Sequence, residues 1–162
     1  MLLALALLTA VAPKLAGQAL PKWLIAPEAK DSLKRLWTES VAANREHVGC
    51  LGGMVGLDTV RVDRVILLDE APGDSLNAPA ELSLATCGPP QWIGTVHTHV
   101  RSTDDPHPAP RFSPDDRVVM SVWSRQWRSK GAFCVVYSDR GAHCEVYPPA
   151  RSQLFITRPP SD

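Results

Sequence analysis

The sequence lacks several features that would assign a function at once. Its 17 Lys and Arg residues balance its 17 Asp and Glu residues, so no excess positive charge recruits nucleic acid. Its four cysteines form no C-x-x-C pair, which argues against a structural zinc knuckle. There is no internal repeat and no low-complexity segment. We therefore expect the 162 residues, 44% of them hydrophobic, to form one domain around a single core.

An uncharged apolar run occupies residues 2–12 and is too short to span a bilayer comfortably. Its length is typical of the hydrophobic part of a signal peptide. No Lys or Arg precedes it and Pro13 follows it, so an N-terminal core helix or a mis-set start codon stays open as an alternative. We expect residues 1–20 to be an export signal or an apolar segment, residues 27–150 to be the domain, and residues 151–162 to be a tail. The protein is then exported or, without a signal, cytoplasmic.

The cysteines add a second indication of compartment. Cys134 and Cys144 flank the turn-forming segment SDRG and would face each other across a hairpin. If the protein is exported, we expect this pair to form a disulfide, whereas buried free thiols are expected in the cytosol. Cys50 is expected to be a small buried core residue rather than a nucleophile.

Apolar residues at helical spacing predict helices at residues 27–43 and 114–128. Each begins with a proline, whose missing N–H costs nothing at the first helical position. Strands are predicted at residues 46–56, 59–68, 92–99, 132–137 and 144–147, and residues 69–90 are predicted to be a loop with one short helical turn. The faces expected to pack on the core are Leu33, Leu36, Trp37 and Val41 in the first helix, and Val118, Val119, Val122, Trp123 and Trp127 in the second. This order predicts an α+β or three-layer α/β sandwich in which helices cover a mixed sheet.

One stretch combines the residues of a metal site. His97 and His99 end a predicted strand two positions apart, so both imidazoles point to the same face. Ser113 is a predicted N-cap, followed by Pro114, and an aspartate in the first turn of that helix can join the histidines. Asp115 and Asp116 are both candidates. Two imidazoles and one carboxylate leave a fourth position open, as hydrolytic zinc requires.

These residues resemble a known family. Glu46 followed by VGCLGG, then GTVHTH, then SPDD, is similar to the pattern of the JAB/MPN (JAMM) zinc metallopeptidases and isopeptidases, over most of residues 27–147. The resemblance implies the cytidine-deaminase-like JAB/MPN sandwich. It also implies that one zinc ion per chain is held by His97, His99 and Asp116. Glu46 would be the general base for the zinc-activated water, and Ser113 would help stabilise the oxyanion.

The sequence departs from the family pattern in the loop between the second histidine and the serine. The loop is longer than in familiar members, with thirteen residues at positions 100–112, and Val100 replaces the proline that normally follows the histidines. We expect this loop to face the substrate. Of its ionisable residues, Asp104, Asp105 and His107 are extra ligands or solvated side chains, and we favour solvation.

The expected function is hydrolysis of an amide or isopeptide bond in a peptide or protein substrate, in the manner of the single-domain prokaryotic members. A ubiquitin-like protein conjugate is one expected substrate. Export would favour a peptide or a cell-envelope amide instead. The alternative is a non-catalytic MPN-like scaffold that binds proteins. A zinc deaminase would need a P-C-x-x-C segment, which the sequence does not contain.

Overall fold

The computed structural model describes residues 20–68, 80–100 and 108–148, so most of the predicted signal segment and the whole predicted tail lie outside the described residues. Its elements are, in chain order, β1 (Lys22–Ile25), α1 (Pro27–Ala43), β2 (Val48–Val55), β3 (Thr59–Leu67), α2 (Ala80–Thr86), β4 (Gly94–Thr98), α3 (Pro114–Trp127), β5 (Gly131–Val136) and β6 (Ala142–Tyr147). The predicted α+β class is confirmed.

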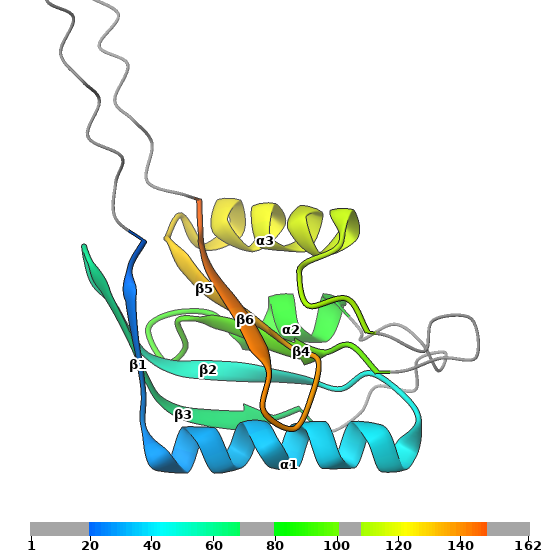
Figure 1. Ribbon diagram of the computed structural model, residues 1–162. Coiled ribbons are helices and arrows are strands. Elements are labelled where there is room, and N and C mark those ends of the chain that lie inside the picture. The colour runs from blue at the N-terminus through cyan, green and yellow to red at the C-terminus, as the bar shows by residue number, and fades with distance from the viewer. Residues whose placement is uncertain (1–19, 69–79, 101–107, 149–162) are drawn as a thin grey trace, which may run out of the picture.

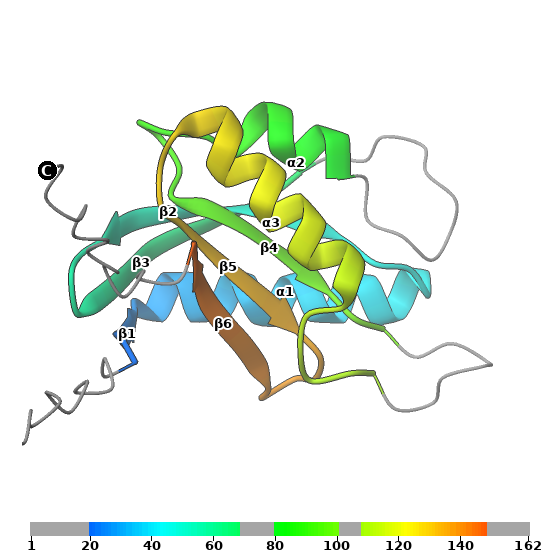
Figure 2. The same ribbon diagram turned by 90° about the horizontal axis from the view of Figure 1, so that it is seen from above.

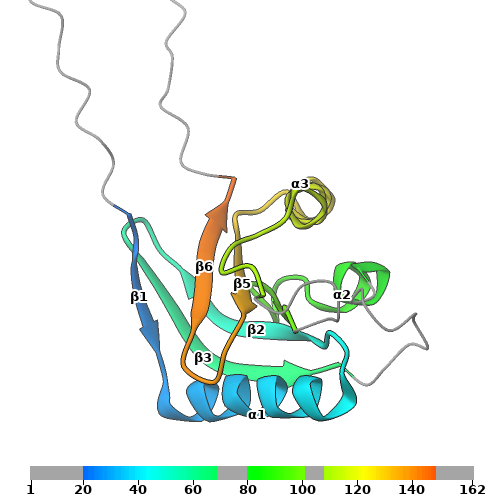
Figure 3. The same cartoon turned by 45° about the vertical axis from the view of Figure 1, so that its right-hand side comes forward.

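A mixed six-stranded sheet forms the centre of the molecule, in the order β1-β3-β2-β4-β5-β6. The β1–β3 and β4–β5 pairs are parallel and the other pairs are antiparallel. The sheet is curled, with α1 against one face and α2 and α3 on the other (Figures 1 and 3). Seen from above, α3 crosses over β4 and β5 with α2 beside it, so these two helices share the face on which β4 presents its histidines (Figure 2).

Helix α1 packs on the sheet through one narrow stripe. Its buried residues are Ala29, Leu33, Leu36 and Ser40, which follow one another at intervals of three or four. Leu33 and Leu36 are therefore core residues as predicted. The prediction for Val41 is wrong, because that side chain is 53% exposed. It lies about 100° around the helix from Ser40, beyond the edge of the stripe.

Helix α3 meets the core through Trp123, as predicted, and also through Met120, which was not predicted, whereas the prediction for Val118 is wrong. Val118 is 60% exposed, whereas Met120 and Trp123 are 2% and 0% exposed. Both buried residues pack with Phe133 and Val135 of β5. The apolar spacing of Val118, Val119 and Val122 fitted a helix, but the orientation of that helix is set by the large side chains beneath it.

Two disulfides link elements of the fold. Cys134 and Cys144 pair directly across β5 and β6, so this predicted bridge is confirmed. Cys50 is a buried core residue, as predicted, but it is also bonded to Cys87, which follows α2, and the sequence did not indicate this bridge. Both cysteines are fully buried. This bridge ties α2 to the central strand β2.

One element was not foreseen, and another is longer than predicted. The four-residue strand β1 has too short a pattern to identify, and it forms because β3 offers a free edge for parallel pairing. Helix α2 lies where one short helical turn was predicted within residues 69–90, but at seven residues it is longer than a single turn. Among the described residues, no helix combines the length and apolar character that crossing a membrane requires.

Candidate metal centre

The two histidines of the H-x-H segment meet at the end of β4. His97 lies within the strand and His99 just beyond it, and their Nε2 atoms are 3.1 Å apart. The rings are tilted by 57°, with centroids 5.0 Å apart. The ring of Phe112 lies beside that of His97, with the two ring centroids 6.0 Å apart. The period of the strand therefore aims both imidazoles at one point, as predicted.

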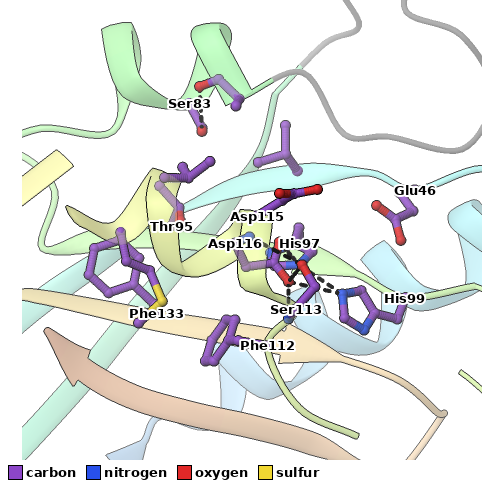
Figure 4. Close-up of a pocket in the computed structure, with 14 residues that line it drawn as sticks. Glu46, Ser83, Thr95, His97, His99, Phe112, Ser113, Asp115, Asp116 and Phe133 are labelled. Atoms are coloured by element: carbon purple, nitrogen blue, oxygen red, sulfur yellow. Dashed lines mark hydrogen bonds and ion pairs between the residues drawn. The ribbon is translucent and has the colours of Figure 1, made fainter. Parts of the chain in front are cut away.

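Asp116 completes the cluster from the start of α3. Its Oδ1 atom lies 3.2 Å from His97 Nε2, and its Oδ2 atom lies 3.4 Å from His99 Nε2. These three residues offer donor atoms that all lie within 4.8 Å of one another (Figure 4). Asp115 is exposed and is not part of this group. The structure thus groups with the histidines the aspartate that the family pattern favoured, Asp116, and not the competing Asp115.

Ser113 holds Asp116 in place through a capping box. The backbone N–H and the hydroxyl of Ser113 each donate to Asp116 Oδ2 at 2.7 Å. In return, the backbone N–H of Asp116 donates to Ser113 Oγ at 3.1 Å. These bonds satisfy free N–H groups of the helix start and fix the rotamer of the carboxylate. The same hydrogen bonds therefore cap the helix and orient the carboxylate that is the candidate metal ligand.

The tautomer of His99 is set by a neighbouring carbonyl. Its Nδ1 atom lies 2.9 Å from the backbone oxygen of Ala109, which can only accept, so the ring proton resides on Nδ1. Nε2 then presents its lone pair to the cluster. Metal-binding histidines are oriented by this kind of second hydrogen bond.

The electrostatics of the cluster favour a positive charge at its centre. Burial alone would raise the pKa of the Asp116 carboxyl, but hydrogen bonds with His97, His99 and Ser113 outweigh it and hold that pKa well below its usual range. Burial lowers the pKa of His99, but Asp116, the carbonyl of Ala109 and the charge of Glu46 together raise it. Lone-pair donors this close repel one another unless a proton or a cation lies among them. A divalent ion that accepts nitrogen and oxygen ligands fits this donor set.

Glu46 lies two residues before the first residue of β2 and lines the same cavity as the cluster (Figure 4). The cavity has a volume of about 500 Å³. Its lining comprises Glu46, Val48, Ala80, Ser83, Thr95, His97, His99, Phe112, Ser113, Asp115, Asp116, Val119, Met120 and Phe133. All five residues that the sequence singled out therefore border one space. Asp104, Asp105 and His107, the other candidates, lie outside the described residues.

A buried chain of hydroxyls, which the sequence analysis missed, fixes β4 against α1 and the start of β2. The hydroxyl of Ser40 donates to Leu36 O at 2.8 Å, so Thr98, 2.8 Å from it, must donate to Ser40 Oγ. Thr98 Oγ1 in turn accepts from the backbone N–H of His47 at 2.9 Å. The backbone N–H of Thr98 donates to His47 O at 3.0 Å. Because Thr98 stands between the two histidines, strand alternation already placed it on the opposite, buried face.

We expect a Thr98→Val variant to lose roughly 1–3 kcal/mol of unfolding free energy, because two buried polar groups lose their partner. Chemical denaturation measures this loss. Thr38→Val is the matched control: Thr38 bonds to Lys34 O on the exposed side of the same helix, so its replacement should cost no more than about 0.5 kcal/mol. Equal losses in the two variants would contradict the role of the buried chain.

Comparisons with known proteins identify distant structural likenesses only. No family model and no curated protein matches the sequence. One similar solved structure is AF2198, a JAB1/MPN domain protein from Archaeoglobus fulgidus, with 19% identity, a TM-score of 0.42, and coverage of 76% of this chain and 87% of that one. Another is protein DSY2949 from Desulfitobacterium hafniense, with 17% identity, a TM-score of 0.46, and coverage of 76% and 82%. Values at this level do not establish a common family, and the function is argued below from the residues of the site.

Proposed function

We propose that the protein is a zinc-dependent metallopeptidase of the JAB/MPN (JAMM) type that hydrolyses an amide or isopeptide bond. One observation carries the proposal: His97, His99 and Asp116 converge on one point of a cavity that Glu46 also lines. Two imidazoles and one carboxylate, with a separate acid nearby, are the donor set of hydrolytic zinc sites. The three converging residues would hold one zinc ion per chain.

Each residue of the site has a task that follows from its position. A bound zinc ion would polarise the scissile carbonyl and make water a nucleophile near neutral pH. The carboxylate of Glu46 takes a proton from the attacking water and passes it to the leaving nitrogen as the C–O bond forms and the C–N bond breaks. His99 keeps its Nδ1 proton on Ala109 O, which leaves its Nε2 lone pair directed into the site.

The main role of Ser113 in this proposal is to orient Asp116. Its hydroxyl proton is directed at Asp116 Oδ2, so it orients the carboxylate that would bind the metal. The oxyanion role that the family resemblance implies would require the hydroxyl to turn away from Asp116. The backbone N–H of Ser113, which also donates to Oδ2, would then keep the carboxylate in place.

The two disulfides bear on the compartment and hence on the substrate. Disulfides persist in oxidising compartments and are rare in the cytosol. Their presence supports export of the protein, to which the apolar run at residues 2–12 also points. In that setting a cytosolic ubiquitin-like conjugate is a poorer candidate substrate. We therefore propose that the substrate is a peptide or a cell-envelope amide.

Metal content and hydrolysis test the proposal together. Purified protein should carry about one zinc per chain and cut members of a panel of peptide and isopeptide substrates, and a chelator should abolish cleavage until zinc is restored. Asp116→Asn should lose zinc, whereas Asp115→Asn, the matched neighbour outside the cluster, should retain it. A folded protein that binds no added zinc would contradict the enzyme and leave the protein-binding scaffold as the alternative.

A further inference from the structure

The cavity extends past the metal-ligating cluster into a chamber between α2 and α3. Thr95 of β4 and Phe133 of β5 form its floor, and Val48 of β2, the cross-strand partner of His97, borders it. Ala80 of α2 and Val119 and Met120 of α3 form its walls. Figure 4 shows Ser83, Thr95 and Phe133 on one side of His97, with Glu46 and His99 on the other. We call this uncharged end the α2–α3 chamber.

The chemistry of the chamber is apolar. None of these lining side chains is ionisable, although Thr95 and Ser83 carry hydroxyls, and Figure 4 shows the carboxylates of Asp115 and Asp116 next to His97, between the chamber and Glu46. The hydroxyl of Ser83, which borders the chamber, already donates to Ala80 O at 2.9 Å. A group that enters the chamber therefore exchanges water for Val, Met and Phe side chains, which rewards an apolar group and penalises a charged one.

The walls of the chamber are fixed in position. The Cys50–Cys87 disulfide anchors the end of α2 to β2. The indole N–H of Trp123 donates to Cys87 O at 3.0 Å, and Gln126 Nε2 donates to Leu84 O at 3.0 Å, so α3 also holds α2. Ser83, Met120 and Phe133 are only 3%, 2% and 1% exposed, so a substrate group would meet the chamber first at Ala80 and Val119, which are partly exposed.

We propose that the α2–α3 chamber is a specificity pocket for a bulky apolar side chain of the substrate, such as Leu, Met or Phe, in a residue that flanks the scissile bond. The inference rests on the proposed hydrolytic function and narrows its substrate class. The chamber adjoins His97 in one continuous cavity, so a side chain in it is attached to backbone near the metal site. A glycine at that position would leave the chamber unfilled. We therefore expect slow cleavage of substrates that have glycine next to the scissile bond, such as conjugates of proteins that end in glycine.

The test compares zinc-loaded protein on peptides that differ at the residues flanking the cleaved bond. Leu, Met or Phe should raise kcat/KM roughly tenfold or more over Gly, since hydrophobic pockets discriminate by about 10- to 200-fold. Ala80→Phe, which fills the chamber, should reduce that ratio and retain zinc. Val118→Phe is the control, because Val118 is exposed on α3 and does not line the cavity, so the ratio should stay unchanged.

A second measurement does not depend on turnover. The Met120 methyl resonance should shift when an N-acetylated leucine amide is titrated into the protein, and should not shift with the glycine amide. Equal cleavage of the Leu and Gly peptides, or an unmoved Met120 resonance, would overturn the specificity pocket while leaving the hydrolase intact. Absence of zinc binding and of all cleavage would overturn the hydrolase, and the methyl titration would still decide whether the chamber binds apolar side chains.

Discussion

A Glu46→Gln variant is expected to lose roughly 100- to 10,000-fold in kcat while it keeps its zinc and its fold. Glutamine has the same shape as glutamate but cannot accept a proton from water. Glu46 lies outside the group of three that can hold the metal, so zinc content should not change. The measurements are steady-state kinetics on the best substrate of the panel and metal analysis of the same preparation.

A control variant and a second measurement make this prediction specific to Glu46. Glu39→Gln, the same change at an exposed acid of α1, should leave kcat unaltered. The charge of Glu46 contributes to the raised pKa of His99, so the pKa of His99 in metal-free Glu46→Gln protein should be lower than in the parent, as an NMR titration of the imidazole would show. Unchanged turnover would remove Glu46 from the mechanism.

Removal of the Cys50–Cys87 bridge by a double substitution to alanine is expected to cost about 4 kcal/mol of unfolding free energy. The bridge closes a loop with a sequence separation of 37 residues, against 10 for Cys134–Cys144. Loop-closure entropy in the unfolded chain grows with loop length, so the second bridge should contribute less, about 3 kcal/mol. Denaturant unfolding of the two double variants measures both values.

The loss would be a large part of the stability of a domain of this size, which is roughly 5–15 kcal/mol. Cys134→Ala/Cys144→Ala is the matched control, because it removes the other bridge, which lies on the β5–β6 side of the sheet. If the variant without Cys134–Cys144 were the less stable of the two, loop length would not govern the contribution of these bridges.

The local features were predictable from short segments of sequence. Proline at the first helical position set the start of α1, and Ser113 with Pro114 set the start of α3. The spacing of His97 and His99 placed both rings on one face because a strand alternates every residue. The Cys134–Cys144 bridge follows from a hairpin whose turn lies between the two cysteines. In each case the interacting groups are near neighbours in the chain.

Other features depended on contacts between distant segments. Cys87 pairs with Cys50 only because α2 packs behind β2, and no local pattern marks that packing. Met120 rather than Val118 turns inward because the side chains of β5 decide the rotation of α3. The Ser40–Thr98 hydroxyl bond likewise joins two elements whose proximity the sequence does not display.

The sequence by itself therefore determined the α+β class, the helix starts and the residue types of the candidate site, since these depend on short-range periodicity, capping and side-chain chemistry. The residues alone left Asp115 and Asp116 open and the family pattern favoured Asp116; the tertiary structure shows Asp116 with the histidines, because the two aspartates differ by about 100° around a helix whose rotation is set by packing. Only the tertiary structure brought Glu46 to the same cavity, through the pairing of β2 with β4. The apolar chamber beside that site arises from three strands and two helices together, and no single segment contains it.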